Sequence, residues 1–139
     1  MKRLIAIGTI TILLGALACS IGLSQGTGQV WLGGFPLLRI RCAAGGYTID
    51  QRVDALQARA NNLLELENGV SAVTVRKSGA DAIIYTDSTL FVTVTTADAR
   101  ANASTTEELA SIWAQRLRAN LPQATLEKPG VGLPGHPSG

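Results

Sequence analysis

Two carboxylates are the side chains whose type and position could support acid–base chemistry in this sequence. Asp87 and Asp98 both lie in predicted loops beside β-prone runs. A glycosidase-like pair must share one cleft with its carboxyl groups about 5 to 10 Å apart, and a chain of this size offers little room for such a cleft. Asp98, in TTADARAN, more simply caps the turn after a strand by accepting backbone N–H bonds. We therefore predict no catalytic residue and keep a small carboxylate-dependent hydrolase as an alternative function.

Histidine and cysteine are too few for the other common kinds of site. Nucleophilic hydrolysis needs a histidine beside the nucleophile, and the only one is His136, close to the C-terminus. Structural zinc needs about four Cys or His ligands, and the chain has three such residues. We expect no metal and no cofactor. Cys42 is predicted to be a small buried residue, and a disulfide between Cys19 and Cys42 is the alternative.

The N-terminal segment predicts where the protein works. Lys2 and Arg3 precede an apolar run over residues 4–18 that ends in Ala-Leu-Ala, which is the order of a secretory signal. Three outcomes are open: cleavage after Ala18, lipoprotein processing with Cys19 as the acylated first residue, or an uncleaved anchor. In each of them the rest of the chain lies in the periplasm or on the outer face of the inner membrane. Contact with the membrane is expected only through this segment or its lipid.

The charge of the remaining chain argues against one class of partner. The sequence has 12 basic and 10 acidic residues, and Lys2 and Arg3 belong to the leader. The mature part is therefore balanced, with no basic excess to neutralise a phosphate backbone. We expect no nucleic-acid binding, and we expect the partner to be an unidentified protein of the cell envelope.

Composition divides the chain into four parts. Residues 1–18 read as the signal peptide or anchor, and residues 19–28 as a flexible Gly- and Ser-rich linker. Residues 29–121 carry the periodic apolar pattern of one folded domain, and residues 122–139 form a Pro- and Gly-rich tail that we expect to be disordered.

The folded part is predicted to be an α+β domain in the order ββαβββα. The predicted elements are hairpin strands around Gly33-Gly34, a helix capped at Thr48, strands in AVTVRK, AIIYT and TLFVTVTT, and a helix capped at Ser104 or Thr105. Each strand offers one apolar face and each helix one apolar stripe. A two-layer sandwich, with two helices on one face of a mainly antiparallel sheet, buries all of them.

Alternation along the strands predicts which side chains stay exposed. Leu38, Ile40 and Cys42 share one face of their strand, and Leu90, Val92 and Val94 share the apolar face of another. The arginines on the opposite face would either provide solubility and cross-strand pairing, or this uncovered face would be a docking surface, because aromatic residues and arginine are enriched at interfaces. Its predicted members are Trp31, Leu37, Arg39, Arg41 and Phe91.

Four segments resemble a known domain. VWLGGFPLLRIR, TIDQRVDALQARANNLLE, LFVTVTTADARAN and EELASIWAQRLRANL occur in the order found in a domain ahead of the membrane part of many cyanobacterial small-conductance mechanosensitive channel homologues. The resemblance covers residues 29–121 and implies a stand-alone extracytoplasmic module without a pore and without catalytic residues. We expect an exported, non-catalytic envelope binding module, and an accessory subunit of a mechanosensitive channel is a further alternative.

Overall fold

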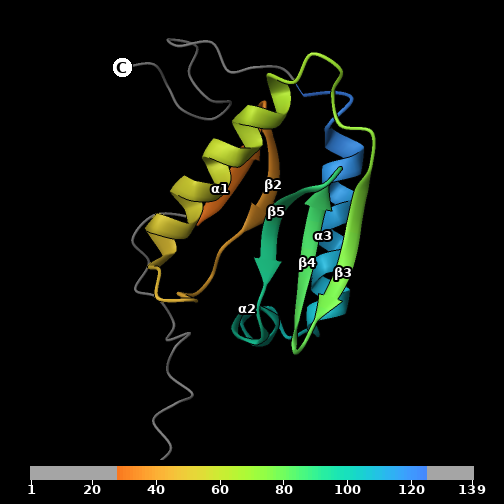
Figure 1. The fold of residues 1–139 in the computed structure, drawn as a ribbon. Helices are drawn as coiled ribbons and strands as arrows, with labels where there is room; N and C mark the ends of the chain where they lie inside the picture. The colour runs from red at the N-terminus through yellow and green to blue at the C-terminus, as the bar shows by residue number, and fades with distance from the viewer. Residues whose placement is uncertain (1–27, 125–139) are drawn as a thin grey trace, which may run out of the picture.

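A computed structural model describes residues 28–124 of the chain, and the structural statements below refer to this part. Its elements are β1 (Gln29–Leu32), β2 (Phe35–Arg39), α1 (Ile49–Leu64), β3 (Val73–Ser78), β4 (Asp81–Thr86), β5 (Thr89–Val94), α2 (Thr96–Ala101) and α3 (Thr106–Asn120) (Figure 1). The α+β class and the order ββαβββα are confirmed, with the short helix α2 added between β5 and α3. The predicted signal peptide, Cys19 and His136 lie outside the described residues.

The strands form two antiparallel sheets where the sequence predicted one. β1 and β2 make a hairpin that turns at Gly33 and Gly34, both at positive φ, as the sequence indicated. β3, β4 and β5 make a second sheet in that order. Helix α3 packs against strands of both sheets, whereas α1 packs mainly against β1 and also contacts β5 (Figure 1). The two helices therefore do not share one face of one sheet.

Side chains end the hydrogen-bond ladders at the sheet edges. The Gln57 amide donates to the carbonyl oxygen of Trp31 and accepts from its N–H, both over 2.9 Å. The guanidinium of Arg118 donates to the carbonyl oxygen of Val73 over 2.6 Å. An edge strand leaves backbone donors and acceptors open to another strand. These side chains occupy the N–H and carbonyl of Trp31 on β1 and the carbonyl of Val73 on β3.

Local capping fixes where the helices begin. Thr48 and Gln51 form the predicted capping box at α1, in which each side chain binds the backbone N–H of the other. The N-cap of α3 is Thr105, which decides between the two predicted registers. A third box, between Thr95 and Asp98, begins α2 directly after β5. This box was predicted only as a turn cap at Asp98.

The core lies between α3 and the two sheets and is closed by α1. Trp113 of α3 is buried. The other large buried apolar residues come from both sheets and both long helices; they include Val30, Leu32, Leu38, Ile40, Leu56, Ile84, Val92, Val94 and Leu117.

A β-bulge in β2 buries a residue that simple alternation places outside. Val30 pairs with Leu38 and Trp31 pairs with Pro36, so Leu37 has no cross-strand partner. An extra residue of this kind shifts the alternation by one position, and both Leu37 and Leu38 are fully buried. The prediction of Leu37 on an exposed docking surface is therefore wrong.

A second bulge has the same effect in β5. Ile84 pairs with Val92 and Tyr85 pairs with Leu90, which leaves Phe91 as the extra residue. Phe91 is only 2% exposed, whereas Leu90 is 38% exposed. The prediction of Phe91 on the docking surface is wrong, and so is the prediction of Leu90 on the apolar face. The bulge exchanges the places of these two neighbours.

This exchange can be tested by removing each side chain. We expect Phe91→Ala to lower the free energy of unfolding by about 3–5 kcal/mol, because it empties a core position. Leu90→Ala, the matched control, should cost about 1 kcal/mol or less, because half-exposed side chains bury little area. Urea unfolding followed by circular dichroism measures both. A regular strand without the bulge would bury Leu90 and expose Phe91, so Leu90→Ala would cost more than Phe91→Ala. That result would contradict the structure.

Candidate functional site

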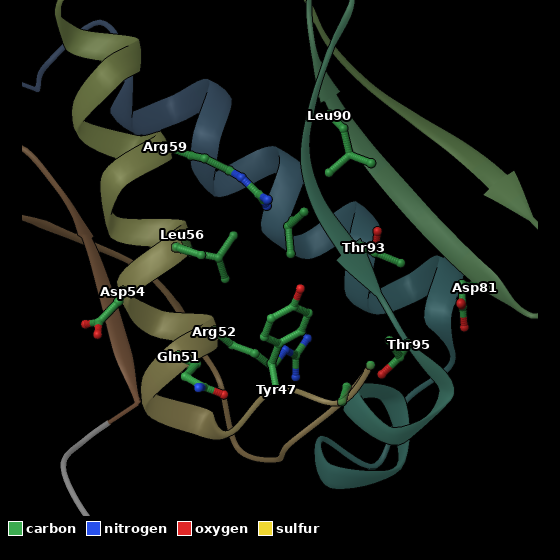
Figure 2. Close-up of a pocket in the computed structure, with 14 residues that line it drawn as sticks. Tyr47, Gln51, Arg52, Asp54, Leu56, Arg59, Asp81, Leu90, Thr93 and Thr95 are labelled. Carbon is green, nitrogen blue, oxygen red and sulfur yellow. The ribbon is translucent and has the colours of Figure 1, made fainter.

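An open groove of about 760 Å³ lies between α1 and β5 (Figure 2). The helix lines one wall with Arg52, Leu56 and Arg59, and the strand lines the other with Leu90 and Thr93. This volume is within the range of about 300–1,000 Å³ that is typical of ligand sites. The groove is the candidate functional site of the described residues.

A tight turn before α1 places an aromatic ring at one end of the groove. Ala44 and Tyr47 exchange backbone hydrogen bonds of 3.1 and 3.0 Å, and Gly45 and Gly46 between them both have positive φ. Glycine adopts this conformation without steric cost. The turn directs the Tyr47 ring into the groove, where 62% of the residue is exposed (Figure 2).

Arg59 lies toward the other end and joins the two walls. It reaches from α1 toward β5 (Figure 2), and its Nη1 donates to the carbonyl oxygen of Phe91 over 2.8 Å. Leu56 lies between Tyr47 and Arg59 on the helix wall (Figure 2). The groove therefore has an aromatic end, an apolar middle and a cationic end.

The β5 wall of the groove is the free edge of the three-stranded sheet. The Asp87 N–H donates to the carbonyl of Ala72 on the β3 side over 2.7 Å. Because backbone groups alternate between the two sides of a strand, the even-numbered residues of β4 turn theirs toward β5. Of these β4 residues, Ala82 pairs with Val94 and Ile84 pairs with Val92, so the backbone groups of Val92 and Val94 point toward β4. Thr93 lies between them, and its N–H and C=O therefore point away from β4, on the groove side of β5.

A buried ion pair lies beneath the Tyr47 end of the groove. Arg52 Nη1 and Nη2 donate to Asp98 Oδ1 and Oδ2, each over 2.8 Å, and the side chains are 10% and 1% exposed. Arg52 Nη1 also donates to the carbonyl oxygen of Cys42 over 2.8 Å. Asp98 Oδ2 accepts in addition from the backbone N–H and the hydroxyl of Thr95. One carboxylate thus joins α1, α2, the end of β5 and the loop at Cys42.

Both members of the pair remain charged near neutral pH. Burial by itself would raise the pKa of Asp98, but the hydrogen bonds from Arg52 and Thr95 and the positive charge of Arg52 outweigh it, and the pKa lies below its ordinary value. Burial likewise disfavours the charged form of Arg52, yet the bond to Asp98 and its charge raise the pKa of the guanidinium. A bidentate pair of this kind is a strong, directional contact.

Cys42 is buried in the same cluster, as predicted for a small core residue. It is 1% exposed, and its Sγ lies 3.5 Å from Asp98 Oδ1. The alternative disulfide to Cys19 involves a residue outside the described range.

The two candidate carboxylates do not form a catalytic pair. Asp98 is the buried partner of Arg52, and Asp87 accepts the backbone N–H groups of Ser71 and Ala72 over 3.1 and 2.9 Å. Asp98 also accepts the backbone N–H of Thr95 over 3.0 Å, which confirms its predicted capping role. The two carboxylates lie at opposite ends of β5, a separation on the order of 20 Å for an extended strand of this length. They therefore share no cleft.

The predicted docking residues are divided by the structure. Arg39 and Arg41 are exposed, as alternation predicted, and Trp31 is half-buried with its backbone bound to Gln57. Leu37 and Phe91 belong to the core. None of these five lines the groove, so the structure does not bring them together in the site described here.

The residues that line the groove were not predicted as site residues, although the positions of two of them in the sequence indicate a special role. Arg52 and Arg59 follow Ile49 and Leu56 by three positions each, so both cations lie on one side of α1, at the border of its apolar stripe. A charge at that border that becomes buried, as Arg52 does, needs a partner. Tyr47 gave no such signal, because its exposure follows from the turn at residues 44–47.

A metal site and a membrane-spanning helix are both absent from the part of the chain that the structure describes. Over residues 28–124, no group of three or more His, Cys, Asp or Glu side chains is placed to hold a metal ion. No helix in this range has the length and apolar character needed to cross a bilayer.

The fold and the site define a small α+β domain with a buried ion pair beneath an open groove. Residues 29–124 match the family described as a domain of unknown function, DUF8459, and the chain belongs to this family. No curated protein matches the chain, and no solved structure does.

The ion pair gives a quantitative prediction. Arg52→Met and Asp98→Asn should each cost about 3–5 kcal/mol of unfolding free energy, because each leaves the other group buried without its partner. The double variant should cost clearly less than the sum, with a coupling of about 1–3 kcal/mol. Urea unfolding of the four proteins completes the cycle. The matched control is Lys77 with Glu107, an exposed pair at 3.2 Å, which should show much weaker coupling.

The coupling should also depend on pH. Because the pKa of Asp98 is lowered on folding, its stabilisation is complete above the unfolded value of about 3.9 and is lost as the pH falls through the folded value. The raised pKa of Arg52 removes stabilisation only in strong alkali. Additive costs at pH 7, or a coupling that does not weaken in acid, would refute the assignment.

Proposed function

We propose that residues 29–121 act as a non-enzymatic binding module in the cell envelope, and that the groove between α1 and β5 is the surface that contacts a protein partner. The exposure of Tyr47 and Leu90 beside Arg59 carries this proposal. Large apolar side chains with 62% and 38% exposure gain free energy when a partner covers them, and aromatic residues and arginine are typical of interface centres.

The surrounding structure is suited to holding this surface in place. The wall residues stand on a helix and a strand, and Arg52 and Asp98 fix the first turns of the helix from below. A preformed surface loses little conformational entropy on binding. The location outside the cytoplasm rests on the signal-like run at residues 4–18. The hydrolase alternative lacks a carboxylate pair at Asp87 and Asp98, and the channel-subunit alternative stays a prediction.

Photocrosslinking in cells that make the full-length chain tests this function. A photoreactive amino acid at position 47 or 90 should form a discrete adduct with an envelope protein. The matched control is position 112, where Ile112 is comparably exposed, at 43%, on α3 and lies outside the groove lining; it should not form that adduct. Adducts of the same pattern from all three positions, or adducts only with cytosolic proteins, would contradict the proposal.

A further inference from the structure

Arg59 is a cation in the groove without a carboxylate beside it. Over residues 28–124 the ion pairs join Arg52 to Asp98 and Lys77 to Glu107, and neither includes Arg59. Its Nη1 donates to the neutral carbonyl oxygen of Phe91 over 2.8 Å. The guanidinium therefore keeps further N–H donors for a ligand.

The acidic residues near the groove do not offset this charge. Asp54 and Asp81 both belong to the groove lining, but the Asp54 side chain points away from the cavity on the outer side of α1, and Asp81 lies beyond β5 (Figure 2). Arg52 is neutralised by Asp98. The cavity consequently has a positive end at Arg59, and a ligand with a carboxylate there is favoured over a neutral one.

The opposite wall offers the hydrogen-bonding pattern of a peptide backbone. Thr93 presents both its N–H and its C=O to the groove, and Phe91 presents its C=O two residues earlier, where Arg59 now binds it. Thr93 therefore offers an added strand one donor and one acceptor, while the carbonyl of Phe91 holds Arg59 beside this edge. Tyr47 and Leu90 provide apolar surface for alternate side chains of that strand.

We infer that the groove takes an extended peptide segment of the partner protein, which adds to β5 as a further strand and places an acidic side chain against Arg59. This inference rests on the proposed function and names the chemistry of its ligand. In strand addition the main-chain bonds at the sheet edge give affinity, and the side-chain contacts give specificity. Here the specificity is for Asp or Glu at one position with an apolar residue on the side of Tyr47.

Peptide titrations followed by amide chemical shifts of the protein test the inference. The probes are acetyl-Thr-Val-Glu-Val-Thr-amide and its Gln counterpart, which differ only in the carboxylate. The Glu peptide should shift the amide of Thr93 and bind about fivefold tighter or better than the Gln peptide. Arg59→Gln should abolish this preference. Arg116→Gln, which removes an exposed arginine of α3, should leave it intact.

Other occupants of the groove give different results, and each would overturn the inference. Equal binding of the two peptides, or no shift of the Thr93 amide with about 1 mM of either peptide, would reject the inference that an acidic strand binds in the groove. The same shifts with sodium acetate alone indicate a site for small carboxylates. If the same shifts appear without peptide when the protein concentration is raised, a second copy of the chain occupies the groove. Discrete adducts at positions 47 and 90 together with any of these results would leave the proposed function standing and reject only the acidic strand.

Discussion

The buried carboxylate of Asp98 connects α1, the start of α2 and the loop at Cys42, which are far apart in the sequence. It begins α2 by binding Thr95, and it holds Arg52, which in turn binds the carbonyl of Cys42. A charge with 1% exposure is stable only when its partners satisfy it. The first turns of α1 are thereby fixed at the end of β5. This contact at the Tyr47 end and the bond from Arg59 to the Phe91 carbonyl at the other end hold the helix wall of the groove beside β5.

Side chains also bind backbone groups at the sheet edges. Gln57 binds the N–H and the carbonyl of Trp31 on β1, and Arg118 binds the carbonyl of Val73 on β3. Arg59 does the same for the carbonyl of Phe91 on β5, whereas the backbone of Thr93 has no such side-chain partner among the described residues. Natural sheets usually protect their edges. The open part of the β5 edge lies beside the exposed side chains of Tyr47 and Leu90, and the proposed binding rests on this surface.

Local features of the fold could be predicted from the sequence, whereas bulges and long-range contacts could not. The Gly33-Gly34 turn and the Thr48 cap depend on neighbouring residues alone. Alternation assumes one residue per cross-strand position, and the bulges at Leu37 and Phe91 break that assumption. Both false docking residues follow from this single cause. The groove depends on contacts between residues 46 positions apart, as in the pair of Arg52 and Asp98, which no local pattern contains.

Amide hydrogen exchange of the protein and its Asp98→Asn variant tests most directly whether the ion pair holds the groove. Exchange at each amide reports the free energy of the local opening that exposes it. If the account is correct, the variant loses protection mainly at residues 42–52 and in α2, while the amides between β3 and β4 change far less. Equal loss along the whole chain, or unchanged protection at residues 42–52, would show that α1 keeps its place beside β5 without the pair.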